Sequence, residues 1–322
     1  MKQRKGLSFL GVLCIVLAVL AIGFFIAGAA LTRPKDAAAE LSRTARTAAG
    51  SVSDNDPSGA LSRFLSWLGG LGEKLGEEID NALTPLEDTG ALKDCSASET
   101  FDAADVAGLS IDLTLGDVEL IPSEDGRIHV DYSCQLSESL QQRHSFSAVR
   151  TGSRVEITQS FGSRNLSANA KSSVRLTVAL PAELGGQWRI STVSGKLSVG
   201  ALTASSLEAS SINGSISALR FACGSIKADT VNGAIDLTLA AAPAALTLES
   251  VNGSVRLGLP PASEFAYDLS NVNGELSLNG FAPAEIFSEE KHHKSGRVGE
   301  NPADASVALS SVNGELELRT NR

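Results

Sequence analysis

The sequence predicts an all-β protein, a parallel β-solenoid of coils about 20 residues long, preceded by one N-terminal transmembrane helix. Two observations carry this prediction: an uncharged stretch of 25 residues near the N-terminus, and six copies of a glycine-centred motif in the C-terminal half. Aromatic residues make up only 5% of the chain. That scarcity agrees with a thin, regular interior, because layered enzymes commonly fill their cores with large rings.

The segment over residues 7–32 is predicted to cross the membrane. Residues 7–31 carry no charged side chain, and about 20 helical residues suffice to span the hydrocarbon core. Lys2, Arg4 and Lys5 precede the segment, so the positive-inside rule places residues 1–6 in the cytoplasm and the bulk of the chain outside. A cleaved signal peptide ending at the small residues 27–29 is the alternative.

Residues 33–92 are predicted to link the membrane segment to the folded domain. Residues 33–58 are rich in Ala, Ser, Thr and Asp without periodicity, which is typical of a tether. Apolar residues then recur at spacings of three and four from Leu61 to Leu83, which predicts an amphipathic helix ending near Pro85. Its polar face is acidic, and the helix either lies on the membrane or a partner, or packs on the domain.

The charge balance excludes nucleic acid as a partner. The net charge is −10, and the chain beyond residue 35 holds 22 basic against 37 acidic residues, which gives −15. Phosphate backbones are bound by clustered Lys and Arg. Three cysteines fall on this side of the membrane segment, Cys95, Cys134 and Cys223. Either Cys95 and Cys134 form a bridge in an oxidising compartment, or the thiols stay unpaired.

The repeats are centred on glycines whose spacings are 19, 19, 20, 21 and 40 residues. Apolar side chains occupy the positions seven, five and two residues before each glycine, and two and four residues after it. Alternation on both sides predicts a strand, a bend at Asn-Gly and a second strand. The predicted bend residues are Gly195, Asn213, Gly214, Asn232, Gly233, Asn252, Gly253, Asn273, Gly274, Asn313 and Gly314.

Two architectures satisfy this pattern. Each unit is one coil of a solenoid, or each Asn-Gly is the type I′ turn of a hairpin in an antiparallel meander. A hairpin would expose the Val or Ile two residues before each glycine, whereas a coil bend turns it inward. The pattern therefore favours the solenoid, with the asparagines stacked as a ladder and the glycines at positive φ.

The coils are assigned to residues 182–322, with residues 279–306 as an insertion that is either a degenerate coil or a loop. Residues 95–181 hold a weaker unit around Gly116 and further strands, and they are predicted to cap the N-terminal end. The charged last strand, which ends at Arg319, is predicted to cap the other end. Cys223-Gly224 lies midway between two bends and is interpreted as a degenerate bend.

Catalytic, cofactor-binding and metal-binding residues are not predicted. The sequence contains no phosphate-binding loop, nucleophile elbow, HExxH motif or CxxC pair. Glu289, Glu290, His292 and His293 lie together in the insertion. Adjacent histidines of a strand point to opposite faces, which suits shared ligation poorly. These four residues form either a partner-binding loop or a solvated excursion.

The GDVEL strand at 116–120 and the repeated Val-Asn-Gly bends, flanked by alternating aliphatic residues, resemble a bacterial family named "putative adhesin". This is a family of β-strand repeats whose function is unknown. The resemblance covers residues 100–322 and carries no catalytic motif. It implies a cell-envelope protein of parallel β-solenoid type, and some relatives are encoded beside envelope-stress signalling systems.

Three functions follow as hypotheses. The first is a membrane-anchored, extracytoplasmic, non-enzymatic module for binding or scaffolding, whose partner is an envelope protein or a glycan. The second is a structural or sensory component of an envelope-stress system. The third, a carbohydrate-active enzyme, requires clustered carboxylates on one face of the solenoid.

Overall fold

The computed structural model describes residues 91–161, 172–300 and 305–321. The strands and the helix reported below belong to one compact unit that spans residues 90–160 and 171–322. The predicted cytoplasmic tail, the membrane segment 7–32 and most of the juxtamembrane region lie outside the described residues. Within the described residues, no helix combines the length and the apolar character that crossing a membrane requires.

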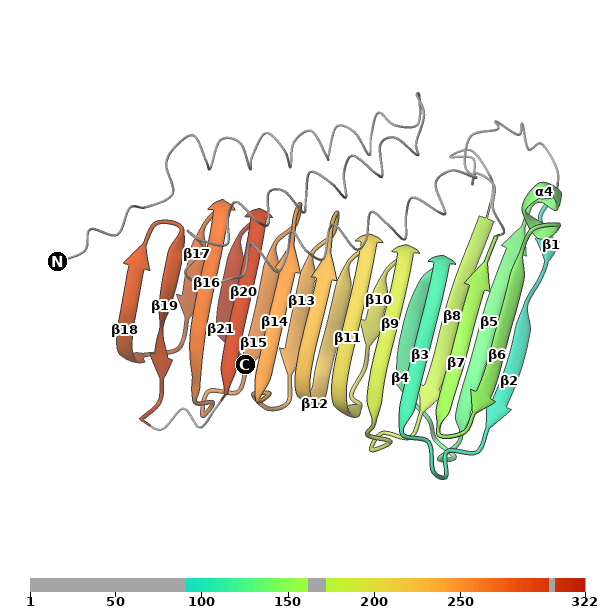
Figure 1. Cartoon of the computed structure of the whole chain (residues 1–322), viewed down its shortest axis with the longest axis horizontal. Helices are drawn as coiled ribbons and strands as arrows, with labels where there is room; N and C mark the ends of the chain where they lie inside the picture. Colours follow the sequence, from blue (N-terminus) through green and yellow to red (C-terminus); the bar gives the residue numbers. More distant parts are fainter. Residues whose placement is uncertain (1–90, 162–171, 301–304, 322) are drawn as a thin grey trace. The chain divides into compact units, whose positions relative to one another are not determined.

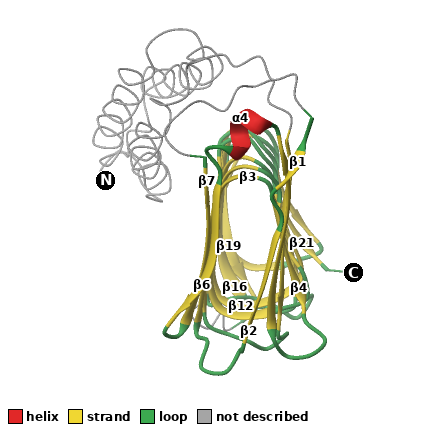
Figure 2. Ribbon diagram, turned by 90° about the vertical axis from the view of Figure 1, so that its right-hand side faces the viewer, coloured by secondary structure: helices red, strands yellow, loops and turns green. Residues whose placement is uncertain are grey.

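The chain forms a two-sheet parallel β-solenoid, which confirms the predicted fold class and excludes the meander of Asn-Gly hairpins. Figure 2 shows the two sheets facing one another. Sheet A consists, in spatial order, of β1 (Lys93–Asp94) and β2 (Ala97–Phe101) along one edge, β5 (Ile128–Leu136), β8 (Ser172–Leu180), β4 (Asp117–Pro122), β10 (Leu197–Val199), the first part of β12 (Ile216–Thr230), β13 (Ile235–Leu239), β15 (Val255–Leu259), β21 (Leu316–Thr320) and β17 (Leu276–Asn279).

Sheet B consists, in spatial order, of β6 (Ser145–Thr151), β7 (Arg154–Ser160), β3 (Gly108–Leu115), β9 (Gln187–Ser194), β11 (Thr203–Asn213), the second part of β12, β14 (Ala245–Ser250), β20 (Ser306–Asn313), β16 (Phe265–Asn273), β19 (His293–Val298) and β18 (Pro283–Glu290). A four-residue helix, α4 (Glu138–Gln141), lies between β5 and β6 in the chain.

The interior is filled by aliphatic columns. The positions five before and two after each repeat glycine are all buried, and Trp188 and Tyr267 occupy the column seven before it. Burying one such side chain contributes roughly 1.5 to 3 kcal/mol. At the bend, the residue three before the glycine is also buried, and it is polar. At four of the six bends its side chain donates to a glycine carbonyl of the neighbouring coil, as in Thr230 Oγ1 to Gly214 O at 3.0 Å.

The order of the coils in space differs from their order in the chain. The last unit, β20 and β21, lies between the coil of β14 and β15 and the coil of β16 and β17, and it pairs in parallel with both (Figure 1). The prediction that the last strand caps the C-terminal end is therefore wrong. That end is formed by β16 and β17, and by the antiparallel hairpin of β18 and β19.

The N-terminal end is built in a similar way. The pair β3 and β4 lies inside the stack, between β9 and β10 on one side and β7 and β8 on the other. Antiparallel strands then cover both sheets, β5 beyond β8 and β6 beyond β7. Antiparallel pairing at the N-terminal end of both sheets and at the C-terminal end of sheet B interrupts the parallel repeat, which limits end-to-end association with further copies.

Cys223-Gly224 is not a bend between two strands, because β12 runs through it. The strand passes from sheet A to sheet B within its own length, with a register shift between Leu219 and Phe221. Arg220 lies in the shift with φ of 53°. In this one coil, the turn from sheet A to sheet B is therefore made at a strained non-glycine residue, Arg220.

The bends are close-packed backbone contacts. A Cβ atom added to Gly253 would overlap the carbonyl oxygen of Gly233, and the same holds for every repeat glycine and its neighbour. Only Gly195 and Gly274 among the six have φ in the left-handed region. The expectation that positive φ explains these glycines is therefore wrong for the other four, and the close approach of neighbouring coils explains them instead.

The asparagines before the glycines form one continuous ladder. In four of the five, Nδ2 donates to the asparagine Oδ1 of the neighbouring coil at 2.9 Å. The order of the ladder is Asn213, Asn232, Asn252, Asn313 and Asn273. Asn313 thus stands between Asn252 and Asn273, which repeats the spatial order of the strands.

We expect Gly253→Ala to lower the free energy of unfolding by about 3 kcal/mol, because the new methyl group meets rigid backbone rather than a side chain that can move. Urea denaturation of the full chain measures the change. Gly126→Ala is the matched control: its φ is +73°, but nothing lies within 4 Å of the added Cβ, so it loses only about 1 kcal/mol to strain. Equal losses in the two variants would contradict the explanation.

Candidate functional site

The predicted partner loop forms the tip of the hairpin of β18 and β19. His292 Nδ1 lies 3.0 Å from Asn271 Oδ1, and His293 Nε2 lies 3.5 Å from Asp268 Oδ1. Both partners belong to β16. Glu289 and Glu290 stand opposite Lys294 and His293 across the hairpin. The two histidines thus fasten the hairpin to β16, and the four side chains do not converge on a common point.

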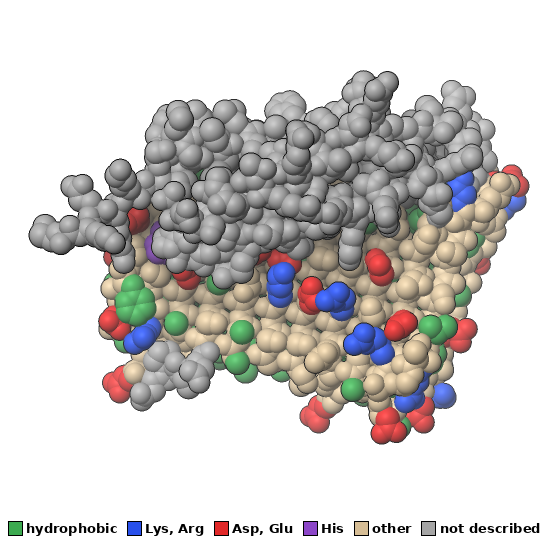
Figure 3. Space-filling model, in the orientation of Figure 1, with side chains coloured by type: hydrophobic (Ala, Val, Ile, Leu, Met, Phe, Trp, Pro, Cys, Tyr) green, Lys and Arg blue, Asp and Glu red, His purple; other side chains and the backbone are tan. Residues whose placement is uncertain are grey.

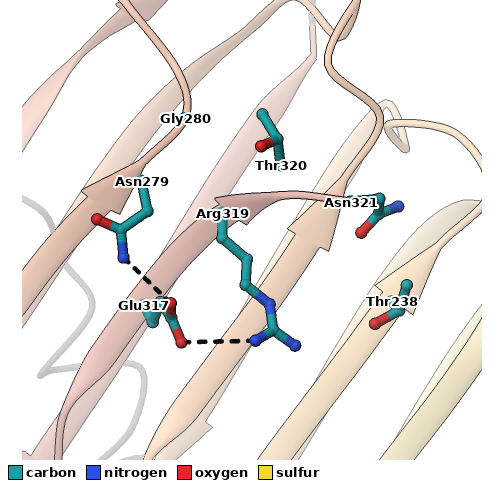
Figure 4. Close-up of a pocket in the computed structure, with 7 residues that line it drawn as sticks. All are labelled: Thr238, Asn279, Gly280, Glu317, Arg319, Thr320 and Asn321. Atoms are coloured by element: carbon teal, nitrogen blue, oxygen red, sulfur yellow. Dashed lines mark hydrogen bonds and ion pairs between the residues drawn. The ribbon is translucent and has the colours of Figure 1, made fainter.

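A groove on the outer face of sheet A brings polar side chains together from three strands. It is lined by Thr238, Asn279, Gly280, Glu317, Arg319, Thr320 and Asn321, and its volume is about 610 Å³. Figure 4 shows these residues on the strand ends, with the Asn279 amide and the Arg319 guanidinium both directed at Glu317. Asn279 Nδ2 donates to Glu317 Oε1 at 3.1 Å.

A second groove of about 390 Å³ continues the first across β12, β10 and β4. Both grooves are lined by Thr238 and Arg319. The second groove also carries Leu219, whose side chain is 59% exposed. Together the two grooves, which we call the sheet A groove, cross the strands of at least five coils.

Acidic and basic side chains alternate along the border of the sheet A groove and form ion pairs. Arg319 lies 3.7 Å from Asp236 and 3.9 Å from Glu317, and Arg256 lies 3.6 Å from Glu317 and 3.9 Å from Glu315. Exposed ion pairs contribute only about 0 to 1 kcal/mol each. These groups can therefore exchange partners for a ligand at little cost to the fold.

The C-terminal residues build one wall of the sheet A groove. Asn321 N donates to Leu259 O and Asn321 Nδ2 donates to Leu239 O, both at 2.7 Å. The Asn321 side chain crosses β15 at Gly258, where an added Cβ would overlap its Oδ1. The sequence pattern missed this site, because Thr238 and Arg319 meet only through the insertion of the last coil.

Figure 3 shows one face of the molecule. Among the side chains drawn in colour, acidic and basic groups are interspersed over a mostly neutral surface. A representative pair on sheet B is Arg189 with Glu208, at 2.6 Å. This pair offers a control arginine on the sheet opposite the groove.

Buried titratable groups lie away from the sheet A groove. Burial raises the pKa of the Cys134 thiol and of the Cys223 thiol to about 11. Burial also lowers the pKa of His144. Cys223 Sγ donates to Ser225 O at 3.0 Å. It thus fills a slot beside the backbone and makes no contact with the groove residues.

We expect Asn321→Ala to loosen the C-terminal residues that line the sheet A groove. The substitution removes the hydrogen bond to Leu239 O, which contributes about 1 kcal/mol. Amide hydrogen exchange in the peptide that covers residues 316–321 should become roughly 5- to 10-fold faster. Thr320→Ala is the control, and it should leave exchange unchanged. Unchanged exchange in Asn321→Ala would show that the Asn321 side chain does not fix the C-terminal residues to sheet A.

This chain has a limited likeness to several solved structures. In the solved structures, a "putative cell adhesion protein" from Clostridium sporogenes has 12% identity and a TM-score of 0.46, covering 71% of this chain and 100% of that one. A "putative adhesin" from Bacteroides fragilis has 12% identity and a TM-score of 0.35, covering 70% and 97%. A "putative lipid binding protein" from Parabacteroides distasonis has 10% identity and a TM-score of 0.30, covering 73% and 98%.

Likeness at this level specifies neither a ligand nor an activity. A search of the curated proteins found no match. The sequence model of the family described as Toastrack DUF4097 matches residues 106–238. These residues include most of the N-terminal cap and the first coils. The resemblance drawn from the repeats is thereby confirmed, as a match to this family over residues 106–238.

Proposed function

We propose that this chain is a membrane-anchored, extracytoplasmic, non-enzymatic module that binds an envelope glycan along the sheet A groove. The single observation that carries the proposal is the groove itself, which crosses the stacked strands of sheet A and whose first part is lined by polar side chains from three strands. Its volume falls in the range of ligand sites. Its position on regular strands supports the preorganisation that binding requires.

The chemistry of the lining favours a hydroxyl-rich ligand. The amides of Asn279 and Asn321, the hydroxyls of Thr238 and Thr320 and the guanidinium of Arg319 offer both donors and acceptors. Cores of protein–protein interfaces are enriched in aromatic side chains and Met, and the lining of the groove contains neither. A glycan fits this lining better than a protein partner does.

The carboxylates of the groove favour binding over hydrolysis. Glycoside hydrolysis requires one carboxyl group that holds a proton and a second that attacks or activates water. Asp236 and Glu317 instead both face the Arg319 guanidinium. Each of the two carboxylates is thus engaged by the same guanidinium, which is an arrangement of ion pairs rather than of a proton donor and a nucleophile.

We expect the double variant Arg319→Ala, Asn279→Ala to bind insoluble cell-wall glycan about 10-fold more weakly, because it removes one charged and one neutral hydrogen-bonding group. Co-sedimentation of the full chain, solubilised in detergent, with purified wall polysaccharide gives the affinity. Arg189→Ala on sheet B is the control and should bind like the wild type. Equal binding by all three proteins, or none by the wild type, would refute a glycan site in the groove.

The anchoring is a separate part of the proposal. The uncharged segment 7–32 and the basic residues before it support a helix with its N-terminus in the cytoplasm. In cells stripped of their wall, external protease should then degrade the part of the chain beyond residue 35, while a cytoplasmic control protein survives. Protection of this part in intact cells, and its degradation only after lysis, would contradict the orientation.

A further inference from the structure

Three metal-ligating side chains meet at the N-terminal end of the solenoid, far from the sheet A groove. Cys95, Cys134 and His144 each offer one donor atom, and these atoms all lie within 4.8 Å of one another. Cys134 is on β5, Cys95 lies between β1 and β2, and His144 lies between α4 and β6. The cluster therefore joins the first described residues of the chain to both sheets.

The strand register holds the two cysteines together. Asp94 pairs with Gln135 and Ala97 with Tyr132, so Cys95 lies directly opposite Cys134. Cys95 N donates to Cys134 O at 2.7 Å. Cys134 is buried, like the other inward-facing residues of β5, while Cys95 and His144 are half-buried.

The distances approach those of a tetrahedral site. Zinc binds sulfur at about 2.3 Å and imidazole nitrogen at about 2.0 Å, which separates the donor atoms of one ion by roughly 3.5 to 3.8 Å. Cys134 Sγ lies 4.0 Å from His144 Nε2. Small side-chain rotations would therefore bring the three donor atoms onto one ion.

The environment orients the imidazole. Gln159 Oε1 accepts the Leu115 N–H at 2.9 Å, so its Nε2 donates to the Tyr132 oxygen, at 2.6 Å. The Tyr132 hydroxyl lies 2.8 Å from His144 Nε2. In the tautomer with the proton on Nδ1, Nε2 accepts from this hydroxyl and presents the lone pair that a metal ligand needs. The Tyr132 ring stacks against His144 and Phe146, with centroid distances of 5.6 and 3.9 Å.

We propose that Cys95, Cys134 and His144 bind one Zn²⁺ ion. The two thiols each release a proton and bind as thiolates, and the neutral imidazole binds through Nε2, where the ion replaces the hydrogen bond from Tyr132. Water or the Tyr132 oxygen completes four-coordination. Two thiolates and an imidazole are the ligand set that borderline-soft cations prefer.

The bound ion would fix the first strands of the domain, β1 and β2, to the rest of the solenoid. All residues of β1 and β2 are exposed except Phe101 at the end of β2, so these strands contribute little buried surface that would hold them to β5. An ion held by Cys95, β5 and the segment before β6 links them to both sheets. The expectation from sequence that no residue binds a metal would then be wrong at this one place.

The test uses the full chain, reduced with a phosphine and freed of metal with a chelator, and Co²⁺ as the probe. We expect one Co²⁺ per chain, with the near-ultraviolet charge-transfer bands of cobalt thiolates, and displacement of Co²⁺ by Zn²⁺. Cys95→Ser and His144→Gln should weaken Co²⁺ binding at least 10-fold while circular dichroism stays that of the wild type. Both positions are only half-buried, so these variants avoid the packing cost of changing Cys134.

Cys223→Ser is the matched control and should bind Co²⁺ like the wild type, because Cys223 lies outside the cluster. Thiolate bands that persist in Cys95→Ser, or that are absent from the reduced wild type, would overturn the site. A disulfide between Cys95 and Cys134 in the protein isolated without reductant, found by mass spectrometry of the linked peptides, would also overturn it. The two cysteines would then form a structural disulfide rather than bind zinc.

Discussion

The close approach of backbones at each bend is the constraint on which the rest of this structure depends. A Cβ atom on any repeat glycine would overlap the carbonyl oxygen of the neighbouring coil. The contact brings adjacent coils into the spacing at which parallel strands hydrogen-bond, and it sets their register without offset. The asparagine ladder and the buried polar residues beside it then satisfy polar groups at the same corner. The contacting glycines follow the order Gly116, Gly195, Gly214, Gly233, Gly253, Gly314 and Gly274.

This constraint also allows the coils to stack in a spatial order that differs from their order in the chain. Every corner is nearly identical, so the coil of β20 and β21 fits between two others as well as at the end. Its insertion leaves antiparallel strands, rather than an open repeat, at the end of sheet B. It also brings β21 next to β15 and β17, and thereby places Arg319 and Asn321 beside Thr238. The proposed glycan groove is a product of this insertion.

Much of the fold follows from periodicity in the sequence. The aliphatic columns are buried as the alternation predicted, because a period of two specifies which side chains share a face of a strand. The order of the coils could not be predicted, since near-identical repeats do not encode which neighbour each one meets. The glycines were identified, but for most of them the predicted reason was wrong, because a close contact between coils leaves no local signal.

The functional candidates were less visible still. The sheet A groove and the cluster of Cys95, Cys134 and His144 both join residues that are far apart in the chain. Only the possible pairing of Cys95 with Cys134 had a signal in the sequence, namely the presence of two cysteines in one region. His144 has no spacing motif relative to either cysteine. The histidines that did attract notice, His292 and His293, instead hold a hairpin in place.

Disulfide trapping between coils tests the central claim, the stacking order, most directly. In a chain whose native cysteines are replaced by serine, Thr247→Cys with Ala308→Cys should form an intramolecular disulfide, since these residues are partners on adjacent strands and neighbouring strands lie about 4.8 Å apart. Thr247→Cys with Asp268→Cys should not, because β20 lies between them. A disulfide in the second pair and none in the first would mean that the coils stack in chain order, and it would contradict the account.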